Sequence, residues 1–245
     1  MKKQIPNLIT LGNLLCGVLA CYYAANDAFQ IAAWCICLGI FLDFFDGMAA
    51  RLLGVTSPLG KELDSLADVV TSGVAPGFIL WGILEEGSVD CTGWFYNYLP
   101  FVALLMPLYA AYRLAKFNID TRQSHSFLGL PVPSNALIWV GVALYMEQTW
   151  FAPAGSYDDL FYQPWFFIVL AGISIITDLL MISEMPMFSL KVNFKDMSWK
   201  TNNIQYIFLI GCAAIIVASR QWYAISLIIL WYIILSAITQ KKHAE

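Results

Sequence analysis

The chain has 245 residues, of which 60% are hydrophobic and only 12% are charged. A soluble domain carries about a quarter charged residues, so this composition excludes an ordinary soluble protein and indicates one embedded in a lipid bilayer. The formal net charge of −4 and the absence of long basic runs also argue against a nucleic-acid partner.

Stretches without charged residues or histidine predict the membrane helices in chain order. Such stretches occur at residues 4–26, 28–42, 69–84, 91–112, 126–146, 160–177, 201–219 and 221–240. A helix of about 20 residues crosses a bilayer core of ~30 Å, so these helices occupy nearly the whole chain. We therefore expect an all-α, polytopic membrane helix bundle of about eight transmembrane helices, forming one membrane-embedded domain over residues 1–245.

The second and third stretches, 28–42 and 69–84, are shorter than a membrane span. They become full spans only if both helices continue through the charged segment between Asp43 and Asp68. The sequence therefore predicts that several carboxylates lie inside the membrane at this one place.

The positions of Lys and Arg predict the orientation, because cytoplasmic loops are enriched in these residues. If the N-terminus is cytoplasmic, 12 of the 13 basic residues fall in cytoplasmic segments, and Arg220 is the exception. Acidic residues such as Asp27, Glu85 and Asp158 fall on the opposite side. We expect a multi-pass protein of the cell membrane, with both termini and the active site at the cytoplasmic face.

Four aspartates are spaced so that they meet at one depth. Asp43 and Asp46 are three residues apart and Asp64 and Asp68 are four apart, so each pair lies on one face of its helix. At about 1.5 Å per residue, both pairs reach about 12 Å into the membrane from the same side. Crowded carboxylates repel one another there, and a hard divalent cation relieves the repulsion. An all-oxygen set suits Mg²⁺, Mn²⁺ or Ca²⁺, and four carboxylates could hold two such ions.

Small and polar residues near the aspartates suit a phosphorylated ligand. Gly47 and Ala50 leave a smooth strip where a bulky group can approach the backbone. Arg51 offers a planar guanidinium to a phosphate. Ser57 and Gly60, in the following loop, suit a polar headgroup.

The pattern D-x-x-D-G-x-x-A-R, then eight residues, then G-x-x-x-D-x-x-x-D runs from Asp43 to Asp68 and resembles the signature of the CDP-alcohol phosphotransferase family. The resemblance implies a six-helix core, here 1–202, that forms a homodimer. The C-terminal hairpin, 203–245, carries no motif. The resemblance also implies that the four aspartates bind two divalent cations and that Asp68 is the general base. Gly47, Arg51 and Ser57 match positions that contact the CDP group, and we add Asn7, Ala50 and Gly60 as candidates. Asn7 and Asn13 could reach the nucleotide or the metal ligands, or pack between helices.

Other segments, 5–13, 64–76, 113–118 and 127–133, resemble the branch of this family that uses serine as the acceptor alcohol. This resemblance implies transfer of the phosphatidyl group from CDP-diacylglycerol to the hydroxyl of L-serine, which gives phosphatidylserine and CMP. Because serine is zwitterionic, it needs a cation for its carboxylate, and we expect Arg113, Lys116 and Asn118 to hold it. Arg113 and Lys116 could instead be ordinary positive-inside anchors.

Two alternatives share parts of this pattern. The same chemistry could use glycerol 3-phosphate or an inositol phosphate, although these acceptors need more positive charge than the few basic residues near the site supply. A cation transporter also has carboxylates inside the membrane, but near the midplane rather than near one surface.

The sequence also predicts the structural roles of three residues outside the site. Asp178 follows the sixth stretch directly, so we expect an interfacial charge that could pair with a basic residue. Gly73 and Gly77 are four residues apart, which is typical of a helix-packing face.

Overall fold

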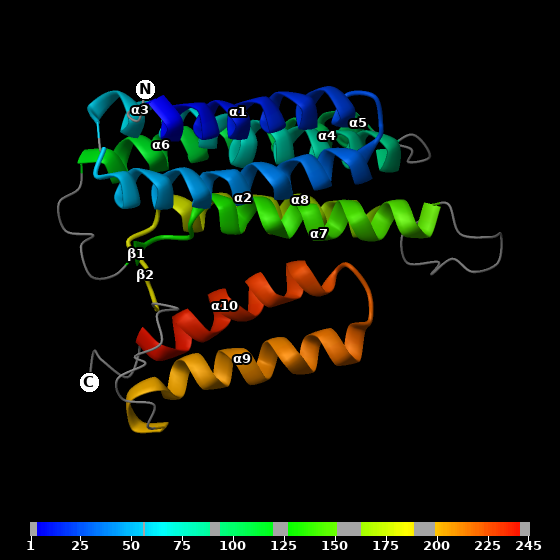
Figure 1. The fold of residues 1–245 in the computed structure, drawn as a ribbon. Coiled ribbons are helices and arrows are strands. Elements are labelled where there is room, and N and C mark those ends of the chain that lie inside the picture. The colour runs from blue at the N-terminus through cyan, green and yellow to red at the C-terminus, as the bar shows by residue number, and fades with distance from the viewer. Residues whose placement is uncertain are drawn as a thin grey trace.

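The protein is described by a computed structural model, which is a bundle of long helices (Figure 1). The structure describes residues 4–55, 57–88, 94–119, 127–150, 163–188 and 199–240. The helices are α1 (Ile5–Ala24), α2 (Phe29–Leu53), α3 (Pro58–Asp68), the π-helix η2 (Val69–Val74), α4 (Ala75–Ser88), α5 (Trp94–Tyr98), the 3₁₀-helix η3 (Leu99–Leu104), α6 (Leu105–Ile119), α7 (Val132–Trp150), α8 (Pro164–Ile182), α9 (Trp199–Ser219) and α10 (Ala224–Gln240). The strands β1 (Phe127–Leu128) and β2 (Pro186–Met187) form a short antiparallel pair. The predicted all-α fold class is confirmed.

The described helices have the length and composition of a multi-pass membrane protein. Six segments are long and apolar enough to cross a bilayer: Ile5–Ala24, Phe29–Leu53, Pro58–Gly87, Phe95–Ile119, Pro164–Ile182 and Asn202–Ser219. Two further apolar helices, Val132–Met146 and Ala224–Thr239, are shorter. Each of these segments corresponds to one of the stretches predicted from the sequence.

Both short stretches continue into the charged segment, as predicted. The helix α2 ends at Gly54, whose φ of +62° is the left-handed conformation that glycine adopts readily after a helix. The next helix, α3, is capped by the hydroxyl of Ser57, which accepts a hydrogen bond of 3.0 Å from the amide of Gly60, and Pro58 occupies its first turn. These two caps confine the turn between the helices to a few residues and bring both sets of aspartates to one end of the bundle.

Close contacts between small residues hold the helices near the site. The backbones of Gly17 in α1 and Gly39 in α2 lie so near Thr71 of η2 that a Cβ at either glycine would overlap it. Gly73 lies against Ala110 of α6, and a Cβ at Gly77 would meet the carbonyl of Ala103 at 3.2 Å. The predicted packing face of Gly73 and Gly77 is therefore confirmed.

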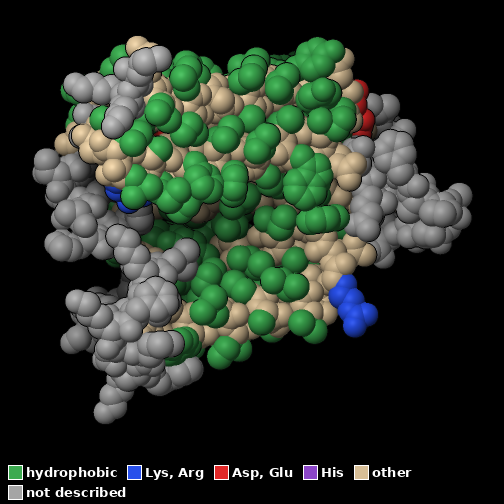
Figure 2. Space-filling model, in the orientation of Figure 1, with side chains coloured by type: hydrophobic (Ala, Val, Ile, Leu, Met, Phe, Trp, Pro, Cys, Tyr) green, Lys and Arg blue, Asp and Glu red, His purple; other side chains and the backbone are tan. Residues whose placement is uncertain are grey.

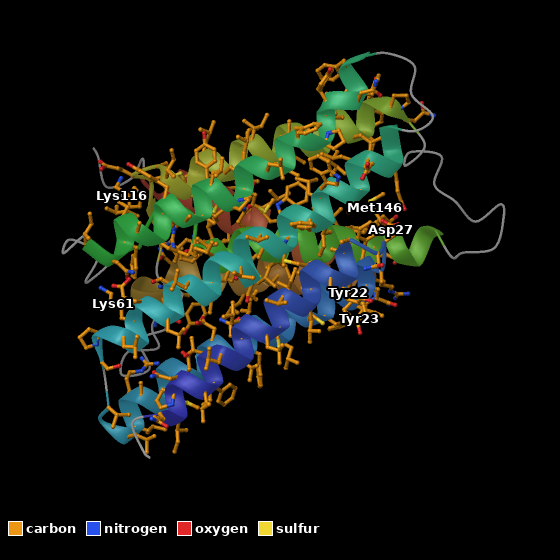
Figure 3. All side chains as sticks on the ribbon, turned by 90° about the horizontal axis from the view of Figure 1, so that it is seen from above. Tyr22, Tyr23, Asp27, Lys61, Lys116 and Met146 are labelled. Carbon is orange, nitrogen blue, oxygen red and sulfur yellow. The ribbon has the colours of Figure 1, made fainter. Side chains whose placement is uncertain are left out.

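The outer surface suits a lipid environment. Hydrophobic side chains cover most of the flank in Figure 2, and charged ones appear near the ends of the helices. Lys61 and Lys116 lie at one end of the bundle and Asp27 at the other (Figure 3). The start of α1 and the end of α10 lie at the same end of the bundle as these two lysines (Figure 1). Which end faces the cytoplasm stays a prediction.

Some residues used to predict the orientation lie outside the described ranges. They are Lys2, Lys3, Arg122, Asp158, Lys191, Lys195, Lys241 and Lys242.

The prediction for Asp178 is wrong. The helix α8 extends to Ile182, past the predicted end at 177, and Asp178 is 0% exposed. Its carboxylate accepts hydrogen bonds from Nδ2 of Asn135 at 3.2 Å and from the hydroxyl of Ser174 at 3.3 Å. Within the described residues it makes no ion pair. A carboxylate can be buried when polar partners satisfy it, and the pattern of apolar residues along the chain does not reveal such partners.

Candidate active site

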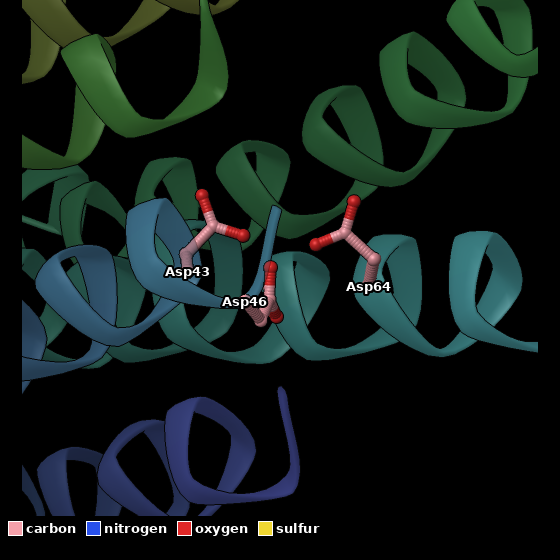
Figure 4. Close-up of side chains that lie close together, drawn as sticks. All are labelled: Asp43, Asp46 and Asp64. Carbon is pink, nitrogen blue, oxygen red and sulfur yellow. The ribbon is translucent and has the colours of Figure 1, made fainter. Parts of the chain in front are cut away.

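Three aspartates converge from two helices (Figure 4). Asp43 and Asp46 project from α2 and Asp64 projects from α3. One carboxylate oxygen of each residue lies within 4.8 Å of the others. The helix α1 packs against both α2 and α3 and so fixes their relative position.

The cluster fits a hard divalent cation. Its ligand atoms are all carboxylate oxygens, which Mg²⁺, Mn²⁺ and Ca²⁺ prefer. The Oδ1 atom of Asp64 is buried and has no hydrogen-bond partner among the described residues. A buried carboxylate oxygen without such a partner is suited to bind a metal ion. Carboxylates this close together in a membrane protein repel one another when ionised, and a bound cation relieves that repulsion.

Two polar residues of α1 orient the aspartates. The hydroxyl of Thr10 donates a hydrogen bond of 2.5 Å to Oδ2 of Asp46, and Asp46 is only 6% exposed. The amide of Asn13 donates to Oδ1 of Asp68 at 3.4 Å. Asn13 therefore lies beside the predicted metal ligands, which is one of the three positions expected for it.

The sequence analysis did not identify Thr10 as a residue of the site. Polar residues recur at three-residue intervals in this apolar helix, at Asn7, Thr10 and Asn13, and this spacing could have revealed the role of Thr10.

Asp68 lies at the edge of the cluster, one helical turn after Asp64. It is not one of the three residues whose oxygens converge within 4.8 Å. It is near enough to interact electrostatically with Asp64, with Asp46 and with the guanidinium of Arg113. This position agrees with a general base beside the metal ligands, and both roles predicted for Asp68 stay predictions.

A cavity of about 580 Å³ opens beside the cluster, a size typical of ligand sites. Asp46 and Asp64 form part of its wall. A Cβ at Gly47 would meet no atom within 4 Å, so this glycine leaves the wall smooth as predicted. All the residues predicted to contact the CDP-lipid line the cavity: Asn7, Gly47, Ala50, Arg51, Ser57 and Gly60.

Two basic side chains border this cavity. Arg51 uses one of its five N–H donors on its own helix, where Nε donates to the carbonyl of Gly47 at 3.0 Å. Nζ of Lys61 donates to the carbonyl of Asn118 at 2.9 Å, which holds its charge between the cavity and the end of α6. Both charges are suited to phosphate oxygens.

The three residues predicted to bind serine lie near the end of α6 in different surroundings. Arg113 is only 7% exposed, and its Nε has no hydrogen-bond partner among the residues that the structure describes. Nζ of Lys116 lies 3.7 Å from Oε1 of Glu184. The amide of Asn118 donates to the hydroxyl of Ser65 at 2.8 Å, which ties α6 to α3. The burial of Arg113 disfavours its alternative interpretation as a surface anchor, because a positive-inside anchor lies at the interface.

Comparisons with known proteins identify the family to which the chain is similar. Residues 3–179 match the sequence model of the family described as CDP-alcohol phosphatidyltransferase. A protein of Helicobacter pylori called CDP-diacylglycerol--serine O-phosphatidyltransferase is 31% identical over 237 residues, which cover 95% of this chain and 89% of the relative. A Bacillus subtilis protein with the same name is 41% identical over 135 residues, or 54% of this chain and 70% of the relative. A third, from Methanocaldococcus jannaschii, is 36% identical over 137 residues, or 56% of this chain and 59% of the relative.

Proposed function

We propose that this chain, which belongs to the CDP-alcohol phosphatidyltransferase family, transfers the phosphatidyl group of CDP-diacylglycerol to the hydroxyl of L-serine and yields phosphatidylserine and CMP. The observation that carries the proposal is the convergence of Asp43, Asp46 and Asp64 beside a cavity of about 580 Å³. The names of the relatives support serine as the acceptor. The family depends on divalent cations, and this cluster is where the chain could bind them.

The cavity suits the nucleotide part of CDP-diacylglycerol. Arg51 and Lys61 border it and would attract the diphosphate. Apolar side chains on the same two helices, such as those of Phe44 and Leu59, are exposed at the lipid-facing surface. They suit the acyl chains, which would stay in the bilayer while the headgroup occupies the cavity.

Four aspartates would hold two divalent cations, Mg²⁺, Mn²⁺ or Ca²⁺. Asp43, Asp46 and Asp64 supply the oxygens that already converge, and Asp68 would join them at the edge. When bound, the cations supply positive charge that neutralises the diphosphate and the departing CMP. Thr10 keeps the Asp46 carboxylate in a fixed orientation for this purpose.

Asp68 is the proposed general base. It takes the proton of the serine hydroxyl, whose oxygen bonds to the phosphorus that carries diacylglycerol. The bond between that phosphorus and the oxygen bridging to CMP breaks, and CMP leaves with the electron pair. Arg113 would bind the serine carboxylate, and its proximity to Asp68 keeps the hydroxyl within reach of the base.

We place the active site at the cytoplasmic face of the cell membrane and expect a homodimer. The end of the bundle that carries Lys61 and Lys116 (Figure 3) also carries the cluster, because Asp64 follows Lys61 by three residues in α3, and this supports the orientation through the positive-inside rule. The family resemblance supports the dimer. Labelling of single cysteines introduced beside Lys61 and beside Asp27, from each side of sealed vesicles, tests the orientation.

The decisive experiment measures CMP release by the purified protein from CDP-diacylglycerol with a panel of alcohols. Serine should be the preferred acceptor, and a chelator should abolish the reaction until Mg²⁺ or Mn²⁺ is restored. A clear preference for glycerol 3-phosphate or inositol phosphate would refute the assignment of serine. Asp68→Asn should lose most of the activity, and near-normal CMP release by this variant would refute its role as the base.

A further inference from the structure

The segment that carries Asp68 is bonded to α1 at two points, and Asn13 supplies both of them. The Nδ2 atom of Asn13 donates to Oδ1 of Asp68 at 3.4 Å, and its backbone carbonyl accepts a hydrogen bond of 3.1 Å from the hydroxyl of Thr71. Thr71 belongs to the π-helix η2, which begins directly after Asp68. One residue of α1 therefore contacts the end of α3 at Asp68 and η2 three residues later.

Both bonds of Asn13 are enclosed by protein. Asn13 and Thr71 are each 0% exposed, so water does not readily replace either partner. The Oδ1 atom of Asn13 has no hydrogen-bond partner among the described residues. The opposite orientation of the amide would bring this oxygen beside the carboxylate of Asp68, where two acceptors would face each other. The bond to Asp68 therefore determines which way the Asn13 amide points.

The packing around Thr71 leaves its side chain little freedom. Gly17 of α1 and Gly39 of α2 leave the space that Thr71 occupies, because a Cβ at either glycine would overlap it. A Cβ at Gly39 would also lie 2.9 Å from Oδ1 of Asn13. Thr71 and Asn13 are thus packed against the same point of α2, and the hydroxyl of Thr71 is held against the carbonyl that it contacts.

The opposite side of η2 packs against α6, which carries the proposed serine ligand. Gly73 lies against Ala110, one turn before Arg113. The guanidinium of Arg113 is near enough to Asp68 to interact with it electrostatically. Asp68 therefore has Asn13 of α1 and Arg113 of α6 as neighbours, and the first of these sets the direction of its carboxylate relative to the second. Wide π-turns of this kind are frequent at functional sites.

We propose that Thr71 is a positioning residue for the general base: its hydroxyl fixes α1 at Asn13, and the amide of Asn13 fixes the carboxylate of Asp68. The inference rests on the proposed function, in which Asp68 takes the proton of the serine hydroxyl. Proton transfer requires the base to lie within hydrogen-bond distance of that hydroxyl, so a small displacement of Asp68 slows the reaction. The binding of CDP-diacylglycerol depends on the other side of the cluster, around Gly47 and Arg51, and should not change.

The test replaces Thr71 by valine, which keeps the shape of the side chain and removes its hydroxyl. CMP release is measured at saturating Mg²⁺ with serine and CDP-diacylglycerol varied in turn. Thr71→Val should lower kcat about two- to tenfold, the factor that corresponds to one neutral hydrogen bond, and leave the KM for CDP-diacylglycerol unchanged. Thr71→Ser retains the hydroxyl and should restore most of kcat.

Ser226→Ala is the matched control for the loss of a buried hydroxyl. The hydroxyl of Ser226 in α10 also donates to a carbonyl of another helix, that of Ile138 in α7, at 2.6 Å. Ser226 is 6% exposed and lies outside the proposed site. Its replacement should change the thermal unfolding midpoint as Thr71→Val does, and it should leave kcat unchanged.

A double variant tests whether Thr71 acts through Asn13. Asn13→Leu removes the donor to Asp68 and should lower kcat at least about tenfold, because hydrogen bonds to charged groups are stronger than neutral ones. If Thr71 acts on Asp68 through Asn13 alone, adding Thr71→Val to Asn13→Leu should cause no further loss.

The possible results separate this inference from the proposed function. If the wild type releases CMP with another alcohol but not with serine, the proposed function fails. If the wild type uses serine and Thr71→Val keeps its kcat, the role of Thr71 fails alone. That role also fails if Thr71→Ser is as slow as Thr71→Val, if Ser226→Ala lowers kcat equally, or if Thr71→Val adds its full effect to Asn13→Leu. Should Thr71→Val not fold, Thr71→Ala removes the same hydroxyl and is judged by the same criteria.

Discussion

Replacement of Thr10 by valine tests whether the hydrogen bond from Thr10 to Asp46 strengthens metal binding at the proposed site. The change keeps the shape of the side chain and removes the hydroxyl that donates to Oδ2 of Asp46 at 2.5 Å. A hydrogen bond to a charged group is worth about 1.5–3 kcal/mol, and Asp46 is too buried for water to replace it easily. Since about 1.4 kcal/mol is a factor of ten, metal binding should weaken roughly 10- to 150-fold. This range overlaps the losses of about 10- to 100-fold that are typical when a metal ligand loses its hydrogen-bond partner.

The assay measures CMP release against Mg²⁺ or Mn²⁺ concentration at saturating CDP-diacylglycerol and serine. Thr10→Val should raise the half-saturating metal concentration, while its maximal rate returns toward that of the wild type at high metal. Thr10→Ser retains the hydroxyl and should behave like the wild type. Thr239→Val removes a hydroxyl that bonds carbonyls of its own helix, far along the chain from the cluster, and controls for the change itself. A Thr10→Val protein with the metal requirement of the wild type would refute the reasoning.

Three further predictions concern the cluster and its supports. Asp64→Asn should lower CMP release by roughly a hundredfold or more, since charge stabilisation by a metal ion is worth several kcal/mol. Glu62→Gln, two residues away in the same helix, should remain active, and equal activity of the two variants would exclude Asp64 as a ligand. Gly17→Ala should lower the thermal unfolding midpoint, because its Cβ would overlap Thr71 at a cost of about 1–3 kcal/mol. Gly47→Ala adds a Cβ that meets no atom within 4 Å, so it should keep the midpoint and raise the KM for CDP-diacylglycerol. Asp178→Ala should destabilise the fold by roughly 2 kcal/mol or more, because it leaves the donors of Asn135 and Ser174 unpaired. Asp178→Asn should cost less. Unchanged thermal unfolding midpoints in both variants would contradict this account.

The convergence of Asp43, Asp46 and Asp64 could be predicted because it follows from helical spacing and from the shortness of the two apolar stretches. Spacings of three and four residues place each pair on one face, and the two short apolar stretches required their helices to continue through the charges. The structure has α2 and α3 extending as expected, and it brings Asp43, Asp46 and Asp64 together. Local periodicity was sufficient for this part of the site.

Contacts between distant segments could not be predicted in the same way. The burial of Asp178 depends on Asn135, which lies 43 residues away, and the pairing of β1 with β2 involves only two residues of each. Neither leaves a periodic pattern in the chain. The π-helix η2 directly follows Asp68, and its wider turn likewise has no marker in the apolar pattern.

The exposed apolar residues beside the aspartates have a kinetic consequence. Phe44 directly follows Asp43, and Leu66 lies between Asp64 and Asp68, yet both side chains are exposed on the lipid-facing surface. A lipid substrate would therefore reach the cluster by lateral diffusion, and the rate would depend on its mole fraction in the bilayer. Serine and CMP exchange with water, so their effect depends on concentration per volume. Dilution of CDP-diacylglycerol with an inert lipid should slow the reaction even when every bulk concentration is held constant.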